Sequence, residues 1–445
     1  MVNQLSKRVD IASVVAFRVL FGGAMVVAVG RFFAHGWIHE YTQVPTHFFT
    51  YWGFGWVRPW SALGMNVHYA VMGVAAFSLM VGFYARASAA LFGLLFAGAH
   101  LIDKTNYLNH YYFVVCVSAL LACMPSDHAC SVRTWLRPEQ ARSEVEVWCL
   151  WLLRFQVGVV YVFGGAAKLN RDWLWYAQPL SIWLNANTEV PLIGRWLHLK
   201  SVAYAFSWAG AFYDLTIVGW LLWRRSRPMA YVAVVGFHVL TARLFQIGIF
   251  PWVMIAASPI FFEPSWPRAL FKRLRIRWPF VAVDAETHTR DLGGAQKFLI
   301  ASYVCVQTLV PLRHWAYPGN PLWTEQGFRF SWNVMLMEKN GAVEMRVTDK
   351  RTGKTSIVDN SDYLTRYQTK MMSTQPDMIL QYAHMIAQNY RARGADVAVC
   401  ADAQVSLNGR RPQPLVDPSV DLALEQDTFA AKSWILPLAA SEPEF

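Results

Sequence analysis

The feature that most restricts the fold of this chain is a series of nine apolar segments separated by polar or basic residues. A helix needs about 20 residues to cross the hydrocarbon core of a bilayer. The sequence therefore predicts a mostly α membrane protein, a polytopic helical bundle of about nine transmembrane helices. The segment at 249–262 is short and leaves the number of spans at eight or nine. The segments cover residues 11–30, 68–85, 87–102, 110–124, 148–168, 202–223, 229–247, 249–262 and 295–312.

Composition agrees with a membrane location. Hydrophobic residues make up 55% of the 445 residues and charged residues 16%, whereas soluble chains carry about 25% charged residues. A formal net charge of +11 in a soluble protein would indicate nucleic acid. Here the arginines occupy loops without interleaved aromatic residues, so we expect no nucleic-acid partner.

The basic residues also predict an orientation. If Lys7 and Arg8 are cytoplasmic, the loops on their side include 133–142, 224–227 and 268–277, which hold most of the arginines. That asymmetry follows the positive-inside rule. An odd number of spans then places the C-terminal region on the opposite side, in a periplasm or lumen. No small-residue cleavage site clearly follows the first apolar run, so we expect it to remain as a span rather than a cleaved signal.

After about residue 318 the composition becomes that of a soluble domain, and we divide the chain into a membrane domain (1–318) and an extramembrane α+β module (319–445). Residues 342–358 alternate around a Gly-bearing turn, which predicts a β-hairpin. Residues 361–392 are predicted to be helical, with Pro376 in the first turn of a second helix. Residues 396–407 alternate again, and Asn408 with Gly409 indicates a turn.

Three ionisable side chains within or beside apolar segments are candidate functional groups, because such groups usually face a cavity or one another. Lys168 ends the fifth segment and is either a lysine that extends to the membrane surface or a partly desolvated base. His110 follows Asn109 in a polar run, which is either a polar helix junction or the rim of a site. His238 is either a satisfied core histidine or part of a polar track with Arg243.

Other kinds of site lack a sequence signal. The six cysteines have no metal-ligand spacing, and we predict no metal site. Phosphate-binding and dinucleotide-binding glycine patterns are also absent, as is the nucleophile elbow of hydrolases. Residue types and spacing therefore predict a polar pocket near the outer face, lined by aromatic residues, without naming a reaction.

Several segments resemble the vitamin K-dependent γ-glutamyl carboxylase family, whose membrane part belongs to the HTTM (horizontally transferred transmembrane) group. The resemblance covers about residues 11–438, and its most specific elements are Lys-Leu-x-x-Asp-Trp and Leu-Phe-x-Ile-Gly-x-Phe. The segments are LIDKTNYLNH (101–110), LRFQ (153–156), VYVFGGAAKLNRDW (160–173), LFQIGIF (244–250), ASPIFFEPSWPR (257–268), FSW (330–332), DKRTG (349–353), VDP (416–418) and KSW (432–434).

This resemblance implies an enzyme that converts glutamate in a peptide or protein to γ-carboxyglutamate. The implied cofactor is reduced vitamin K, a phylloquinone or menaquinone hydroquinone, with O2 and CO2 as co-substrates and the quinone epoxide as second product. Lys168 matches the lysine that deprotonates the hydroquinone. Asn109 and His110 match the pair at the quinone head group, and His238 matches another polar residue of that cavity.

The chain also departs from the animal members of the family. Met337 stands where they carry a histidine, and Tyr107 stands where they carry Trp. The disulfide that joins their membrane and lumenal parts has no evident counterpart. The shorter length and the Arg-rich loops indicate a bacterial homologue in the inner membrane, with a cytoplasmic N-terminus and a periplasmic C-terminal module.

Two alternatives to a carboxylase stay open on the sequence. The first is a quinone epoxidase or oxidoreductase that carboxylates nothing, which the departure at Met337 keeps open. The second is a non-catalytic HTTM membrane protein that binds a secreted peptide. The joint presence of Lys168, Asn109 and His110 favours catalysis over the second alternative.

Overall fold

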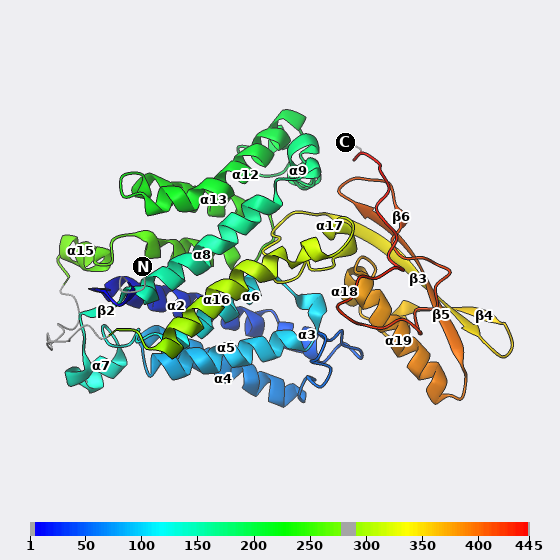
Figure 1. Cartoon of the computed structure of the whole chain (residues 1–445), viewed down its shortest axis with the longest axis horizontal. Helices are drawn as coiled ribbons and strands as arrows, with labels where there is room; N and C mark the ends of the chain where they lie inside the picture. Colours follow the sequence, from blue (N-terminus) through cyan, green and yellow to red (C-terminus); the bar gives the residue numbers. More distant parts are fainter. Residues whose placement is uncertain (1–4, 277–290, 444–445) are drawn as a thin grey trace.

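The computed structural model describes residues 5–276 and 291–443. Helices cover all nine apolar segments and form an elongated bundle (Figure 1). They are α2 (Ala12–Ala34), α4 (Ala62–Val81), α5 (Ala85–Leu101), α6 (Asn109–Cys123), α8 (Val147–Ala167), α12 (Lys200–Leu222), α13 (Arg227–Leu244), α14 (Phe250–Ala257) with η3 (Ser258–Phe261), and α16 (Gly294–Leu312).

Within these described residues, five helices are long and apolar enough to cross a membrane: α2, α4, α8, α12 and α16 with its extension η4 (Arg313–Ala316). The apolar helices α5, α6 and α14 with η3 are shorter. Helix α13 has 18 residues but carries arginines near both ends. The protein is therefore a membrane protein with several apolar helices, and the predicted number of nine spans is not confirmed.

Short elements join the long helices at both ends of the bundle. The end of the bundle that faces the C-terminal β-sheet region carries α3 (Trp37–Thr42), η1 (Lys104–Asn106), α9 (Arg171–Tyr176), α10 (Leu180–Asn185) and α11 (Gly194–Leu197). Asn170 caps α9 by accepting a hydrogen bond from the Trp173 backbone N–H, so the chain turns sharply just after Lys168.

The N-terminus and the C-terminal β-sheet region lie at opposite ends of the bundle (Figure 1). Strand β1 (Arg8–Asp10) pairs antiparallel with β2 (Glu144–Glu146). Helices α7 (Val132–Leu136) and α15 (Trp266–Arg273) lie at this same end, and Arg268 binds Asp10 at 2.8 Å. The basic segments 133–142 and 268–273 thus gather with the N-terminus, as the charge pattern predicted.

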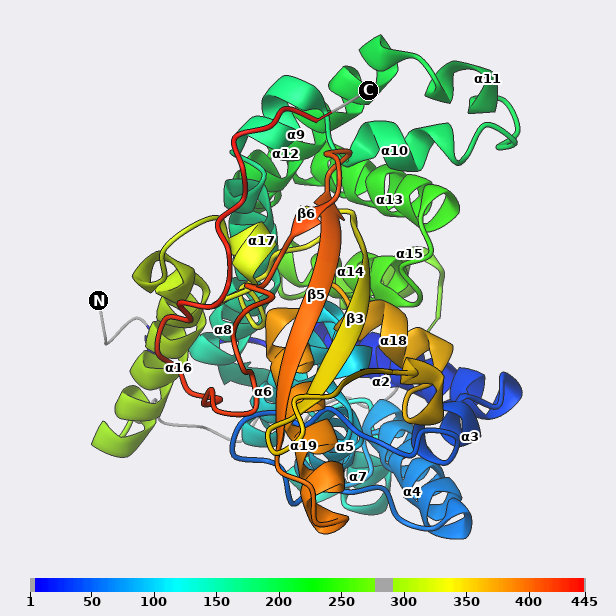
Figure 2. The ribbon, with the colours of Figure 1, turned by 90° about the vertical axis from the view of Figure 1, so that its right-hand side faces the viewer.

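The C-terminal region contains an antiparallel sheet of order β4-β3-β5-β6. Helices α18 (Arg366–Met372) and α19 (Pro376–Ala392) pack against one face of it (Figure 2). The predicted hairpin and helices are confirmed, and both Asn408 and Gly409 have the positive φ that their turn requires. The strands are β3 (Lys339–Asp349), β4 (Thr355–Val358), β5 (Val397–Leu407) and β6 (Gln413–Pro414).

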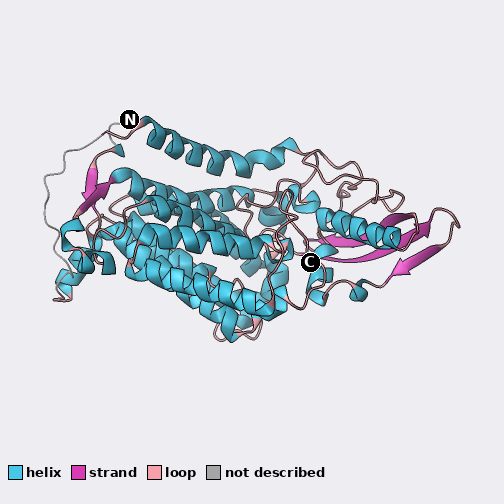
Figure 3. Cartoon of the chain, turned by 90° about the horizontal axis from the view of Figure 1, so that it is seen from below, coloured by secondary structure: helices cyan, strands magenta, loops and turns pink. Residues whose placement is uncertain are grey.

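Alternation along β5 explains why this sheet has one apolar face. Val397, Val399, Ala401 and Ala403 are all buried and form a core with α19, while the intervening residues face away from it. Apart from β1 and β2, the strands of the described chain are confined to this region (Figure 3). The bundle encloses a separate apolar core of its own.

Charged and amide side chains join this sheet region to the bundle. Arg410 binds Asp172 through two hydrogen bonds of 2.6 and 2.7 Å, and both side chains are only 8% exposed. Asn408 donates a further hydrogen bond to the same carboxylate. The segment that follows Lys168 is therefore anchored to the end of β5.

Candidate functional site

Lys168 lies at the C-terminal end of α8 and points into the protein. Its Nζ atom donates hydrogen bonds to Asp214 Oδ2 at 2.8 Å and to the Gly164 carbonyl oxygen at 3.1 Å. The Lys168 side chain is 7% exposed, so it does not extend to water in the way that a lysine at the membrane surface would. The Trp173 ring lies 5.2 Å from Nζ and covers it further.

Asp214 is a candidate site residue that was not predicted from the sequence. It lies in the middle of α12, is buried, and is the only acidic residue in that helix. An acid within an apolar span is itself a signal for a functional group. Helices α8 and α12 approach each other closely at Gly165, where a Cβ atom would lie only 2.8 Å from the Leu215 backbone nitrogen. A glycine at this position leaves room for that approach.

The Lys168–Asp214 pair forms part of the wall of a cavity of about 470 Å³, which we call the lysine cavity. His238 of α13 lies in the same wall, and its Nε2 atom is hydrogen-bonded to the Tyr161 hydroxyl at 2.8 Å. Its Nδ1 atom is buried and has no hydrogen-bond partner among the described residues. Most other walls are apolar, including Val160, Leu180, Phe206, Leu240, Leu244, Phe245, Phe250, Met254 and Met335.

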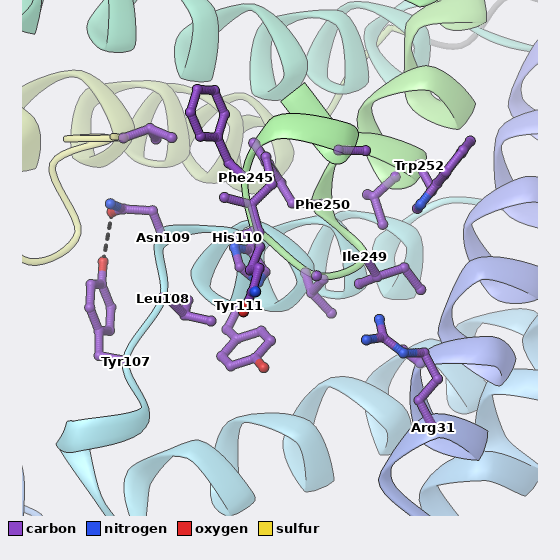
Figure 4. Close-up of a pocket in the computed structure, with 18 of the residues that line it drawn as sticks. Arg31, Tyr107, Leu108, Asn109, His110, Tyr111, Phe245, Ile249, Phe250 and Trp252 are labelled. Carbon is purple, nitrogen blue, oxygen red and sulfur yellow. Dashed lines mark hydrogen bonds between the residues drawn. The ribbon is translucent and has the colours of Figure 1, made fainter. Parts of the chain in front are cut away.

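Asn109 and His110 begin α6 and line a second cavity of about 780 Å³, which we call the histidine cavity (Figure 4). Asn109 accepts a hydrogen bond from the Tyr107 hydroxyl and donates one to the Asn333 carbonyl oxygen. Its amide keeps a second N–H and a second lone pair. The His110 ring stacks on Phe250 at 5.3 Å and makes no hydrogen bond to the described residues.

The structure thus places Lys168 with His238 and Asn109 with His110, in two cavities that share part of their walls. The shared residues are Phe245, Ile247, Phe250, Val334 and Met335. Phe250 contacts both histidines, since its ring centre also lies 6.3 Å from that of His238. A planar ligand that contacted both Lys168 and His110 would have to lie at this shared wall.

Met337 borders a third cavity of about 410 Å³, which we call the methionine cavity. Phe245, Ile247 and Met335 line all three cavities. The segment 328–337 precedes β3 and contributes to each of them, so it joins the bundle cavities to the β-sheet region. In the sequence, this segment was marked by its Ser-Trp element and by Met337.

A charged cluster lies outside the spans, next to α6. Asp377 of α19 binds Arg329 at 2.7 Å and Lys104 at 2.6 Å. Burial raises the pKa of the Asp377 carboxyl, but the charges of Arg329 and Lys104 outweigh it and hold that pKa well below its ordinary value. Burial lowers the pKa of Lys104. The cluster ties the loop before Asn109 to α19.

Comparison with known proteins separates the chain into two matching parts. The family model described as "HTTM domain" matches residues 6–266. The model described as "Vitamin K-dependent gamma-carboxylase, lumenal domain" matches residues 294–441. No solved structure matches the chain. The first model covers the bundle from α2 to η3, the second covers α16 together with the β-sheet region, and the chain belongs to the vitamin K-dependent gamma-carboxylase family.

Proposed function

We propose that this protein carboxylates glutamate residues of a peptide or protein, using a reduced naphthoquinone, O2 and CO2, and releases the quinone epoxide. The observation that carries the proposal is the Lys168–Asp214 pair in the wall of the lysine cavity. When bound, reduced vitamin K reacts with O2 to supply a base strong enough to remove a γ-proton from glutamate, so that CO2 can add.

The described residues fit a quinone ring. A cavity of about 470 Å³ is within the usual range for small-molecule sites. His238 has a buried ring nitrogen without a partner, and the His110 ring has no hydrogen bond to the described residues. Buried polar groups need partners, and quinone oxygens would supply them. Phe250, between the two histidines, offers a face for stacking.

The Lys168–Asp214 pair can hold a proton in two ways. With the proton on Lys168 Nζ, the pair is an ammonium and a carboxylate. Transfer of that proton to Asp214 Oδ2 leaves a neutral amine without changing the charge of the cavity. Lys168 Nζ can then accept a proton from a hydroquinone hydroxyl, while the aromatic walls exclude water that would quench a carbanion.

The peptide would approach through the methionine cavity, because residues of the β-sheet region and of the bundle meet there. The proposal places the extramembrane module, 319–445, and this approach on the periplasmic or lumenal side. The gathering of the basic loops with the N-terminus at the opposite end supports that orientation.

Met337 in the methionine cavity supports one rival, an enzyme that epoxidises its quinone without carboxylating a peptide. A single assay separates the functions. Purified protein receives reduced vitamin K, labelled bicarbonate and a Glu-containing peptide, and both peptide label and epoxide are measured. We expect both products. Epoxide without label would support the rival, and neither product would indicate a non-catalytic protein.

A further inference from the structure

One end of the histidine cavity is formed by α2, α3 and α14, and we call it the outer end. It contains hydrogen-bond donors that the proposed quinone site does not use. Arg31, in the last turn of α2, points from that helix toward Ile249 (Figure 4). Its guanidinium lies 5.3 Å from the centre of the Trp37 ring and makes no hydrogen bond or ion pair with the described residues. A guanidinium has five N–H donors and no acceptor.

Other donors line the same end of the cavity. The Trp37 and Trp252 indole N–H groups and the Tyr41 hydroxyl also donate no hydrogen bond to the part of the chain that the structure describes. None of the residues that line the cavity is acidic. Glu40 precedes Tyr41 and interacts with it electrostatically, but its carboxylate is not part of the cavity wall. Four donor side chains in a wall without a carboxylate form a site for an anion with several oxygen atoms, such as a phosphate.

The surroundings of these donors are those of a membrane surface. Arg31 lies one turn from the end of a spanning helix, and on that helix Val27 is 58% and Phe33 45% exposed. Trp252 is 53% exposed. Arginine and tryptophan at the end of a span lie at the depth of lipid head groups. Behind Arg31, Met25 and Phe32 continue the cavity as an apolar wall.

We propose that the outer end of the histidine cavity binds an anionic phospholipid of the surrounding bilayer. The phosphate lies against Arg31, Trp37 and Trp252, and one acyl chain follows Met25 and Phe32 into the protein. A quinone tail is entirely apolar and would leave the Arg31 guanidinium without an acceptor. The site therefore differs in chemistry from the lysine cavity and goes beyond the proposed carboxylation.

The test measures lipid that stays bound to the whole protein. Protein is reconstituted with phosphatidylglycerol and phosphatidylcholine, transferred to detergent, and examined by native mass spectrometry. We expect about one phosphatidylglycerol per chain for the wild type. Arg31→Gln should lower its retention roughly tenfold or more, because it removes charge-assisted hydrogen bonds. Arg243→Gln is the matched control, since Arg243 is exposed at the end of α13 and lines none of the three cavities.

A second variant keeps the charge of Arg31 and blocks the path of the lipid acyl chain. Ala28→Phe fills the histidine cavity from α2 and should lower lipid retention with Arg31 intact. Glycerol 3-phosphate at the same concentration should not displace the lipid, because it lacks the acyl chain. The proposal is wrong if Arg31→Gln retains as much phosphatidylglycerol as the wild type. It is also wrong if added menaquinone displaces the lipid, since the cavity would then hold a quinone tail.

Discussion

Lys168 Nζ lies 2.8 Å from Asp214 Oδ2, and this contact joins α8 to α12 inside the bundle. Both side chains are at most 10% exposed, so each charge depends on the other for compensation. The contact also places the amine at the wall of the lysine cavity. Structure and proposed chemistry therefore depend on the same pair, and variants can separate the two.

Asp214→Asn should destabilise the protein by about 3–5 kcal/mol and lower epoxidation strongly, because it leaves the Lys168 ammonium without a charge partner. Chemical denaturation and an epoxide assay measure the two effects. The double variant Lys168→Met/Asp214→Leu replaces the pair with apolar groups and should recover most of the stability. It should remain inactive. Epoxidation by the double variant would show that the pair has only a structural role.

His110→Ala should weaken use of the quinone. The ring contributes a stacking face on Phe250 and a nitrogen open to the histidine cavity. Loss of one hydrogen bond to a buried group costs about 1–3 kcal/mol, which corresponds to roughly a tenfold to hundredfold slower epoxidation. Initial rates across quinone concentrations measure the change, and a variant with the wild-type rate and KM would contradict the assignment of His110.

Arg410→Met should loosen the segment that follows Lys168. Asp172 would keep its charge, with Asn408 as its remaining side-chain partner. Removing one member of a buried pair costs about 3–5 kcal/mol. Thermal unfolding should show a clear decrease in Tm, whereas Arg351→Met, in the exposed β3–β4 turn, should change Tm little. Equal Tm values for both variants would mean that the anchor is unimportant.

Asp377 should make stability sensitive to acid. Its pKa in the folded protein lies below its ordinary value because Arg329 and Lys104 outweigh the opposing effect of burial. The stabilisation is therefore complete above the unfolded pKa of about 4 and is lost as pH falls from there through the folded pKa. The difference in Tm between wild type and Asp377→Asn should shrink below pH 4. A difference that stays constant from pH 6 to pH 3 would contradict this.

The positions of the helices could be predicted because apolar runs report directly on burial or contact with lipid. The number of spans could not. Helices α5 and α6 have only 17 and 15 residues, and whether such helices cross a bilayer depends on neighbours and tilt. The hairpin of β3 and β4 was predictable because alternation and a glycine turn are local signals.

The site was less accessible to sequence reasoning. Lys168 at a helix end is compatible with exposure or burial, and only the approach of α12 at Gly165 decides between them. Asp214 has no distinctive neighbours in the sequence, so its partner could not be named. The separation of Lys168 from His110 by Phe245 and Phe250 depends on side-chain packing, which residue spacing does not report.

The most direct test of the account compares Lys168→Ala with wild type in one assay for epoxide and peptide label. Lys297→Ala is the control, because Lys297 is exposed on α16. We predict that Lys168→Ala stays folded, although it is less stable than the wild type because Asp214 loses its partner, and that it forms neither product. Lys297→Ala should form both products, and small added amines should restore part of the activity of Lys168→Ala. Near-normal epoxidation by folded Lys168→Ala without an added amine would contradict the role of Lys168 as the base.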